Sequence, residues 1–157
     1  MKPKVYLETT IPSYLTAWPT RDLLRSAHQQ VTREWWRDRR ADFDLFVSEF
    51  VIREVSAGDP LAAADRLRAL EGVPILKSND ASTDLALELE RGGTLPEKAA
   101  VDVLHIALAV VSGMDYLLTW NCSHIANATL WGRIETICRS CGYHPPIICT
   151  PMELLES

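Results

Sequence analysis

Two polar side chains interrupt the most apolar segment of the sequence. Residues 99–111 read AAVDVLHIALAVV, and only Asp102 and His105 are polar in this run. A helix that is apolar on nearly every side is buried, and a buried carboxylate costs several kcal/mol unless a partner compensates for it. Asp102 and His105 are three residues apart, so they share one helix face. A hydrogen bond between them would satisfy both groups, and this structural interpretation competes with a functional one.

Three further oxygen-bearing side chains are predicted to face one crevice. Glu8 follows a short apolar strand at 5–7, and Asn121 follows another at 116–119. Ligands of open α/β sheets bind outside the carboxyl ends of the strands. Glu54 lies on the inward side of the helix predicted after the second strand. Singly, Glu8 and Asn121 could be turn residues and Glu54 a surface ion-pair partner, but together with Asp102 they favour a functional site.

The atoms of this set determine the chemistry that it could perform. Carboxylate and amide oxygens are hard ligands, which suit Mg²⁺ or Mn²⁺ better than a soft metal. Crowded carboxylates repel one another, so the cluster stays ionised only if a cation neutralises it. Such a cation lowers the pKa of a bound water and stabilises charge on a phosphodiester. The sequence contains no obvious nucleophile–base pair or glycine-rich phosphate loop, so metal-assisted hydrolysis is the favoured reaction.

Short strands alternating with helices must position these residues. This alternation predicts an α/β sandwich around a mostly parallel sheet. Ser48 is predicted to cap one helix and Asp59 another, and Thr94 with Glu97 has the spacing of a capping box. The loop after Glu8 is expected to contain Pro12. The strands are expected near 5–7, 45–47, 73–76, 116–119 and 147–149, and the helices near 20–40, 49–57, 60–71, 80–91, 94–112 and 123–141.

Composition and charge restrict the class of protein. A chain of 157 residues with 47% hydrophobic and 24% charged residues fits one globular domain over 1–157. The net charge of -5 argues against binding of a polyanion through a broad positively charged surface. Metal ions can nevertheless neutralise an acidic cleft. Four irregularly spaced cysteines do not suggest a disulfide framework. We expect a cytoplasmic protein with no membrane partner, because no apolar run approaches the ~20 residues of a spanning helix.

Four segments of the sequence resemble the PIN domain, and more closely the VapC-type toxins of bacterial toxin–antitoxin pairs. They are VYLETT near the start, SEFVIRE after the second strand, AVDVLHIALA on the apolar helix and DYLLTWNCSHIAN after it. The resemblance covers nearly the whole chain, and the order and spacing of the four segments make it specific. It implies a PIN-like three-layer sandwich, in which a central, mostly parallel sheet of four or five strands is flanked by helices on both faces.

The resemblance also implies an acidic quartet that binds one or two Mg²⁺ or Mn²⁺ ions and cleaves RNA. Carried over by motif, the first acid is Glu8, the second Glu54 and the third Asp102, and the fourth position falls on Asn121. We expect Glu8, Asp102 and Asn121 to ligate the metal. An antitoxin partner beside the early helices and a homodimer are implied as well.

Other positions in these motifs are expected to assist the metal site. Thr9 matches the small hydroxyl residue after the first acid, and Thr119 matches a hydroxyl residue two positions before the fourth. His105 is expected to donate a hydrogen bond to Asp102 without contacting the metal, or to assist proton transfer. Two positions depart from the pattern, because Glu8 has one more methylene group than the usual Asp and Asn121 offers a neutral oxygen. We therefore expect one metal to be held more firmly than two.

Two other features of the sequence have alternative interpretations. Segment 20–40 carries more arginine residues than acidic residues. This excess is typical either of a solvent-exposed helix face or of a surface at the edge of the site that binds the phosphates of RNA. The adjacent residues Trp35 and Trp36 of this segment cannot share a helix face, so one should enter the core.

Zinc is an alternative metal. Its candidate ligands are Cys138, Cys141 and His144, but the only candidates for a second half are Cys122 and His124. This spacing makes zinc a minor possibility.

Three functions are therefore compatible with the sequence. The favoured one is a metal-dependent endoribonuclease that acts as the toxin of a type II toxin–antitoxin pair. Its rival is a catalytically weak or inactive PIN-like module that binds RNA or a protein partner, which the substitutions at Glu8 and Asn121 keep open. A structure-specific DNA nuclease is a third, since an acidic metal site does not itself distinguish the two sugars.

Overall fold

Five parallel strands form the centre of the protein. The computed structural model describes residues 1–156, and its sheet has the strand order β3-β2-β1-β4-β5. Every neighbouring pair in this order is parallel, so the predicted parallel sheet is confirmed. The strands are β1 (Lys4–Leu7), β2 (Asp44–Ser48), β3 (Ile75–Leu76), β4 (Tyr116–Leu118) and β5 (Ile147–Cys149).

The order of the strands reverses beside the central strand. From β1 the chain proceeds outward to β2 and β3, then returns to place β4 and β5 on the other side of β1. Tyr6 is accordingly in register with Phe46 on one side and with Leu117 on the other. The reversal of direction between β1 and β4 is the topological switch point at which open α/β sheets bind ligands.

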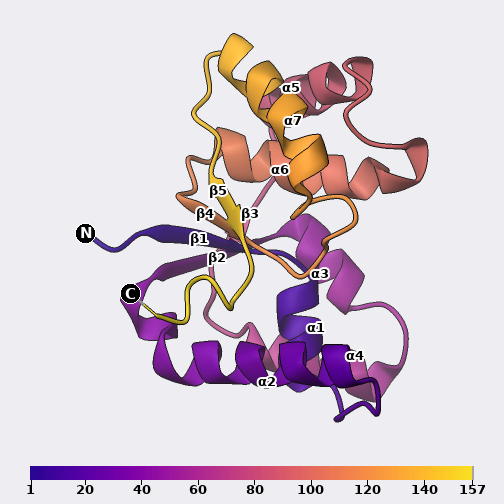
Figure 1. Ribbon diagram of the computed structural model, residues 1–157, viewed down its shortest axis with the longest axis vertical. Helices are drawn as coiled ribbons and strands as arrows, with labels where there is room; N and C mark the ends of the chain where they lie inside the picture. Colours follow the sequence, from indigo (N-terminus) through magenta and orange to yellow (C-terminus); the bar gives the residue numbers. More distant parts are fainter. Residues whose placement is uncertain (157) are drawn as a thin grey trace.

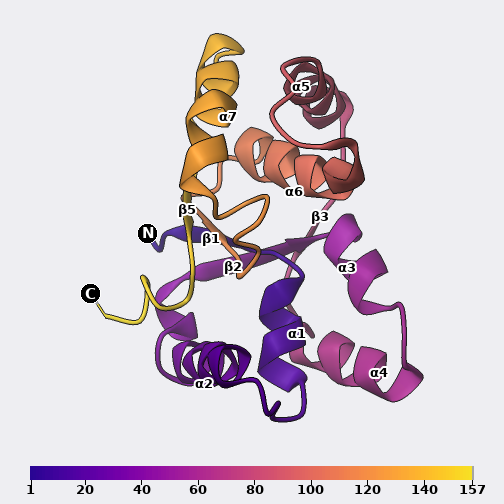
Figure 2. The same cartoon turned by 45° about the vertical axis from the view of Figure 1, so that its right-hand side comes forward.

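Helices cover both faces of the sheet. In Figures 1 and 2, α5, α6 and α7 lie on one face, and α1, α2 and α4 lie on the other. Helix α3 contacts both α4 and α6. The protein is thus the predicted three-layer sandwich. The helices are α1 (Thr10–Thr16), α2 (Leu23–Asp38), α3 (Glu49–Val55), α4 (Pro60–Ala69), α5 (Asp80–Arg91), α6 (Ala100–Val111) and α7 (Ala128–Ser140).

Side-chain caps set the start of several helices, and two of these caps were predicted. The Ser48 hydroxyl accepts a hydrogen bond from the Val51 amide and caps α3. Asp59 caps α4, with Pro60 at the first helical position, where its missing N–H is not needed. These caps matter for the site because the first one fixes α3, which carries Glu54, to the carboxyl end of β2.

Three sequence-based expectations about helices were wrong. Residues 10–16, expected as a loop because of Pro12, form α1, since proline is tolerated in the first turn of a helix. The Thr94–Glu97 capping box does not form: the Thr94 hydroxyl donates to the carbonyl of Leu89, and α6 begins only at Ala100. Helix α7 begins at residue 128 rather than 123, because residues 122–125 form turns.

The core lies between the sheet and the two helical layers. Val5, Tyr6 and Leu7 of β1 are fully buried, as expected for the central strand. Trp35 is also fully buried, whereas Trp36 is half-buried and carries the guanidinium of Arg40 over its ring at 3.9 Å. The two tryptophans therefore divide as predicted. Among residues 1–156, no helix is long and apolar enough to cross a membrane.

Candidate active site

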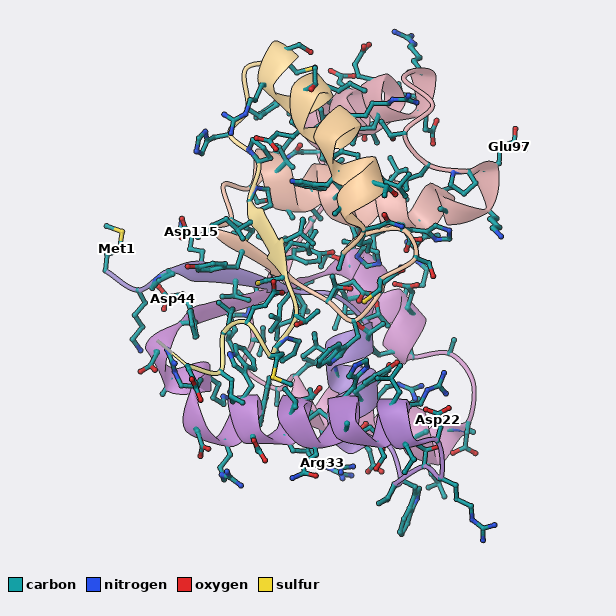
Figure 3. All side chains as sticks on the ribbon, in the orientation of Figure 1. Met1, Asp22, Arg33, Asp44, Glu97 and Asp115 are labelled. Carbon is teal, nitrogen blue, oxygen red and sulfur yellow. The ribbon has the colours of Figure 1, made fainter. Side chains whose placement is uncertain are left out.

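The site lies at the carboxyl ends of β1 and β4. Figure 3 marks the opposite, amino edge of the sheet by Asp44, at the start of β2, and Asp115, just before β4. At the carboxyl edge, the backbone amide of Glu8 donates to the carbonyl of Leu118 at 3.0 Å. This bond continues the β1–β4 pairing by one residue and fixes the first predicted acid at the switch point.

Hydroxyl groups surround one carboxylate oxygen of Glu8. Its Oε1 accepts hydrogen bonds from the hydroxyls of Thr119 at 2.6 Å and Thr10 at 2.5 Å, and from the Thr10 amide at 3.2 Å. The side chain is only 4% exposed, and this burial raises the pKa of the Glu8 carboxyl although the three hydrogen bonds oppose the shift. Ionisation of Glu8 in this pocket therefore has a free-energy cost that a bound cation would offset.

The second carboxylate oxygen of Glu8 is available to a ligand. Within residues 1–156, Oε2 of Glu8 accepts no hydrogen bond from the protein. In the same range, the indole Nε1 of Trp35 is the one fully buried side-chain N or O atom that has no hydrogen-bond partner. Oε2 is therefore not completely enclosed by the protein.

Asp102 occupies the first turn of α6 and faces the residues that follow β4. Its Oδ1 accepts a hydrogen bond from the Asn121 side-chain amide at 3.2 Å, and its Oδ2 lies 3.0 Å from Nδ1 of His124. The His124 amide in turn donates to Oδ1 of Asn121. The Asp102 side chain is 18% exposed, so it reaches the surface instead of being enclosed in the core. Helix α6 is buried, but its third residue reaches the edge of the sheet.

Glu54 is carried by α3, the helix that follows β2. Its Oε1 accepts a 2.6 Å hydrogen bond from the Thr9 hydroxyl and lies 2.6 Å from Nε2 of His105. Partial burial raises the pKa of the Glu54 carboxyl, but the hydrogen bonds from His105 and Thr9 outweigh it, and the net shift is downward. The side chain is 39% exposed, so a ligand can reach it from solvent.

The expected hydrogen bond between Asp102 and His105 is not present. His105 is fully buried and lies between Glu54 and the hydroxyl of Tyr6, 2.6 Å from its Nδ1. The histidine partner of Asp102 is His124 instead. The two residues share a face of α6, but Asp102 is at the end of the helix near β4 whereas His105 is one turn deeper, over the central strand.

The predicted site residues form two hydrogen-bonded groups, which the peptide bond between Glu8 and Thr9 joins. Thr119 links Glu8 to Asn121, because its hydroxyl donates to Glu8 and accepts from the Asn121 amide at 2.9 Å. Asn121 then contacts Asp102, and Thr9, the neighbour of Glu8, contacts Glu54. The four positions expected to form the quartet therefore meet at the carboxyl edge of the sheet.

The donor set fits a hard divalent cation. Glu8, Asp102 and Asn121 offer carboxylate and amide oxygens, the ligands preferred by Mg²⁺ and Mn²⁺. Residues 1–156 contain no group of three His, Cys, Asp or Glu side chains arranged to hold a metal ion. Mg²⁺ does not require one, since it commonly binds one or two carboxylates and completes its coordination with water and substrate phosphate. The same finding leaves the zinc alternative without a ligand group.

Three residues of the site were not recognised in the sequence. Thr10 bonds to Glu8, Tyr6 bonds to His105, and Ser48 bonds to Tyr6 at 2.7 Å. The signal for Tyr6 was a hydroxyl within an otherwise apolar strand, since a buried phenol needs a partner. Ser48 had been identified only as a helix cap, and the structure gives it both roles.

Comparison with known proteins identifies the fold. No protein-family model matches the sequence, and no curated protein matches it either. Among solved structures, the chain is similar to a chain of the crystal structure of VapBC2 from Rickettsia felis bound to a DNA fragment from their promoter. The two chains are 17% identical, the match covers 94% of this chain and 98% of the other, and the TM-score is 0.60. The protein therefore has the PIN-like fold that its four sequence motifs predict.

Proposed function

We propose that the protein is a metal-dependent endoribonuclease and the toxin of a type II toxin–antitoxin pair. The observation that carries this proposal is a pair of hydrogen-bonded groups at the carboxyl edge of the sheet: one contains Glu8, Asn121 and Asp102, and the other holds Glu54 through Thr9, the residue next to Glu8. Such a concentration of oxygen ligands at the ligand-binding edge of an α/β sheet suits metal-assisted hydrolysis of a phosphodiester. The fold shared with a VapBC2 chain supports the choice of a toxin.

Each residue of these groups has a distinct role in this reaction. Glu8, Asp102 and Asn121 would hold Mg²⁺ or Mn²⁺, which lowers the pKa of a bound water and neutralises the phosphate. Glu54 stays ionised at neutral pH because its pKa is lowered. It orients the attacking water and accepts a proton from it. Thr9 and Thr119 hold the carboxylates of Glu54 and Glu8 by hydrogen bonds to Oε1 of each.

The two departures from the usual quartet define the expected metal content. Asn121 contributes a neutral oxygen, and its amide nitrogen contacts Asp102. A second metal ion would therefore face less negative charge than in a site with four acids, and its binding would be weaker. We propose one tightly held ion per site.

A cleavage assay tests the proposal. The purified protein is incubated with mixed RNAs and with single-stranded DNA, in Mg²⁺, Mn²⁺ or chelator, beside the variants Asp102→Asn and Asp84→Asn. Asp84 is an exposed residue of α5, so its variant is a matched control. We expect RNA cleavage that requires metal and Asp102 but not Asp84. Cleavage that survives both chelation and the Asp102 substitution would refute the mechanism, and cleavage of DNA alone would identify a DNA nuclease.

The alternative is a PIN-like module that binds RNA or a protein without cleaving. One observation favours it: the fourth position of the quartet is an amide that donates a hydrogen bond to the third acid instead of a carboxylate that shares a metal with it. Retained RNA binding with no cleavage under any metal condition would establish this alternative.

An antitoxin is the partner that we propose. A hollow between α1 and α4 is lined by Trp18 and Leu61, whose side chains are 92% and 79% exposed, and it could receive an apolar side chain of a partner segment. We expect the product of a short neighbouring reading frame to co-purify with the chain. Leu61→Ser should weaken that complex, whereas Leu87→Ser, on α5 in the opposite layer, should not.

We also propose that the protein forms a homodimer, as the resemblance implies. Sedimentation velocity on the isolated chain measures this directly. A single monomeric species at micromolar concentration would contradict it.

A further inference from the structure

A buried chain of hydrogen bonds runs from β2 to the candidate catalytic carboxylate Glu54. The Ser48 hydroxyl lies 2.7 Å from the Tyr6 hydroxyl, which lies 2.6 Å from Nδ1 of His105, and Nε2 of His105 lies 2.6 Å from Oε1 of Glu54. Ser48, Tyr6 and His105 are all fully buried. Bulk water therefore does not reach their polar atoms, and each of these groups has a protein partner within the chain of hydrogen bonds.

Only one distribution of protons satisfies every atom of this chain. With a neutral imidazole protonated on Nε2, His105 donates to Glu54, Tyr6 donates to Nδ1, and Ser48 donates to the oxygen of Tyr6. If Nδ1 carried a proton, the Tyr6 hydroxyl would have to donate to Ser48. The Ser48 hydroxyl hydrogen would then have no acceptor among residues 1–156, since its other contact is the donor amide of Val51. A buried hydroxyl without an acceptor is costly.

The chain also acts on only one side of Glu54. Both donors, His105 and Thr9, bond to Oε1. Within residues 1–156, Oε2 of Glu54 accepts no hydrogen bond, so it is available to a bound water. The two donors fix the position of Oε1 in a side chain that is 39% exposed. Without them, a glutamate with this exposure would sample several rotamers.

We infer that His105 is a positioning residue for Glu54, held by Tyr6 and Ser48 in the neutral tautomer that carries its proton on Nε2. The effect of His105 on catalysis rests on the proposed function, in which Oε2 of Glu54 orients the attacking water. The arrangement of protons does not depend on that function. The two parts can therefore be tested separately.

The tautomer is measured by NMR on ¹⁵N-labelled protein. Two-bond ¹H–¹⁵N correlations of His105 at neutral pH are expected to report a protonated Nε2 and an unprotonated Nδ1. In Tyr6→Phe, which removes the hydroxyl that donates to Nδ1, we expect the ¹⁵N shifts of His105 to move toward a mixture of tautomers. A protonated Nδ1 in the wild-type protein would overturn the inference, whether or not the protein cleaves RNA.

Kinetics test the link to Glu54. Tyr6→Phe is expected to lower kcat by about 10–100-fold, as removal of such outer contacts typically does, with KM changed less than twofold. In a Glu54→Gln background the same substitution should change kcat by less than twofold. Tyr116→Phe is the matched control, because Tyr116 is a half-buried residue of β4 with no hydrogen bond from its hydroxyl within residues 1–156. An equal loss in both backgrounds would show that Tyr6 acts independently of Glu54 and would overturn the inference.

Discussion

The hydroxyl of Thr119 donates a 2.6 Å hydrogen bond to Oε1 of Glu8, across the boundary between β4 and β1. Both side chains are almost completely buried, with exposed fractions of 0% and 4%. The bond joins residues 111 positions apart in the sequence. It therefore ties the first acid to the strand that delivers Asn121.

Removing this hydroxyl should destabilise the protein. Thr119→Val preserves the shape of the side chain but leaves a buried carboxylate with one donor fewer, so we expect a loss of about 1–3 kcal/mol in the free energy of unfolding. Urea denaturation at neutral pH measures it. Thr136→Val, at an exposed position of α7, should stay within about 0.5 kcal/mol of wild type. Equal effects of the two substitutions would contradict the role given to Thr119.

The raised pKa of Glu8 makes the stability of the protein depend on pH. The pKa of Glu8 in the folded state lies above the ordinary value of 4.5. The folded state therefore binds the proton more tightly than the unfolded state, and this adds to the free energy of unfolding in full below about pH 4.5. This contribution is lost as the pH rises through the raised pKa. Relative to Glu8→Gln, the wild-type protein should therefore lose stability as the pH rises above about 4.5 and through the raised pKa. Thermal unfolding in chelator from pH 4 to pH 8 tests this, and a constant difference in Tm would refute it.

Restoring an acid at the fourth position should have opposite effects with and without metal. Asn121→Asp replaces the amide that donates to Asp102 by a second negative charge. Without metal we expect a loss of about 1–3 kcal/mol in stability, because a hydrogen bond is replaced by repulsion. With Mn²⁺ we expect about tenfold tighter binding, or 1.4 kcal/mol. Calorimetric titration with Mn²⁺ measures the affinity, and unchanged binding would place the metal away from residue 121.

Trp120 fixes the loop of the site to α2, and this contact is testable. Its indole Nε1 donates to the Thr32 hydroxyl at 2.7 Å, and its ring stacks on His28 with centroids 3.9 Å apart. Thr32→Val removes the acceptor of a buried donor and should cost about 1–3 kcal/mol. Chemical denaturation followed by tryptophan fluorescence measures the loss. The exposed Thr83→Val on α5 is the control, and an effect of Thr32→Val no larger than that of the control would contradict the anchoring role.

The parallel sheet was predictable because its strands are short apolar runs bounded by polar residues. The site position was predictable for a related reason, since Glu8 and Asn121 come directly after two of these runs. Helix α1 was not predictable in the same way, because Pro12 is equally compatible with a loop and with the first turn of a helix. Its assignment depends on the packing of α1 against α2 and α4.

The partner of His105 could not be derived from its spacing to Asp102. A separation of three residues places two side chains on one face of a helix, but it does not specify what that face contacts. Here the face spans two environments: Asp102 meets Asn121 and His124 at the sheet edge, whereas His105 meets the hydroxyl of Tyr6. That difference follows from the position of α6 over β1, which is a tertiary feature.

The strand order has a consequence for the nascent chain. The ribosome synthesises Glu8 early, and β1 can pair with β2 as soon as residues 44–48 have emerged. The other neighbour of β1 is β4, which is made much later, and Asn121 follows it. A polypeptide still in translation therefore has an incomplete set of the proposed metal ligands until most of the chain has been made. A nuclease built in this order would stay inactive beside the messenger and ribosomal RNA from which it is being produced.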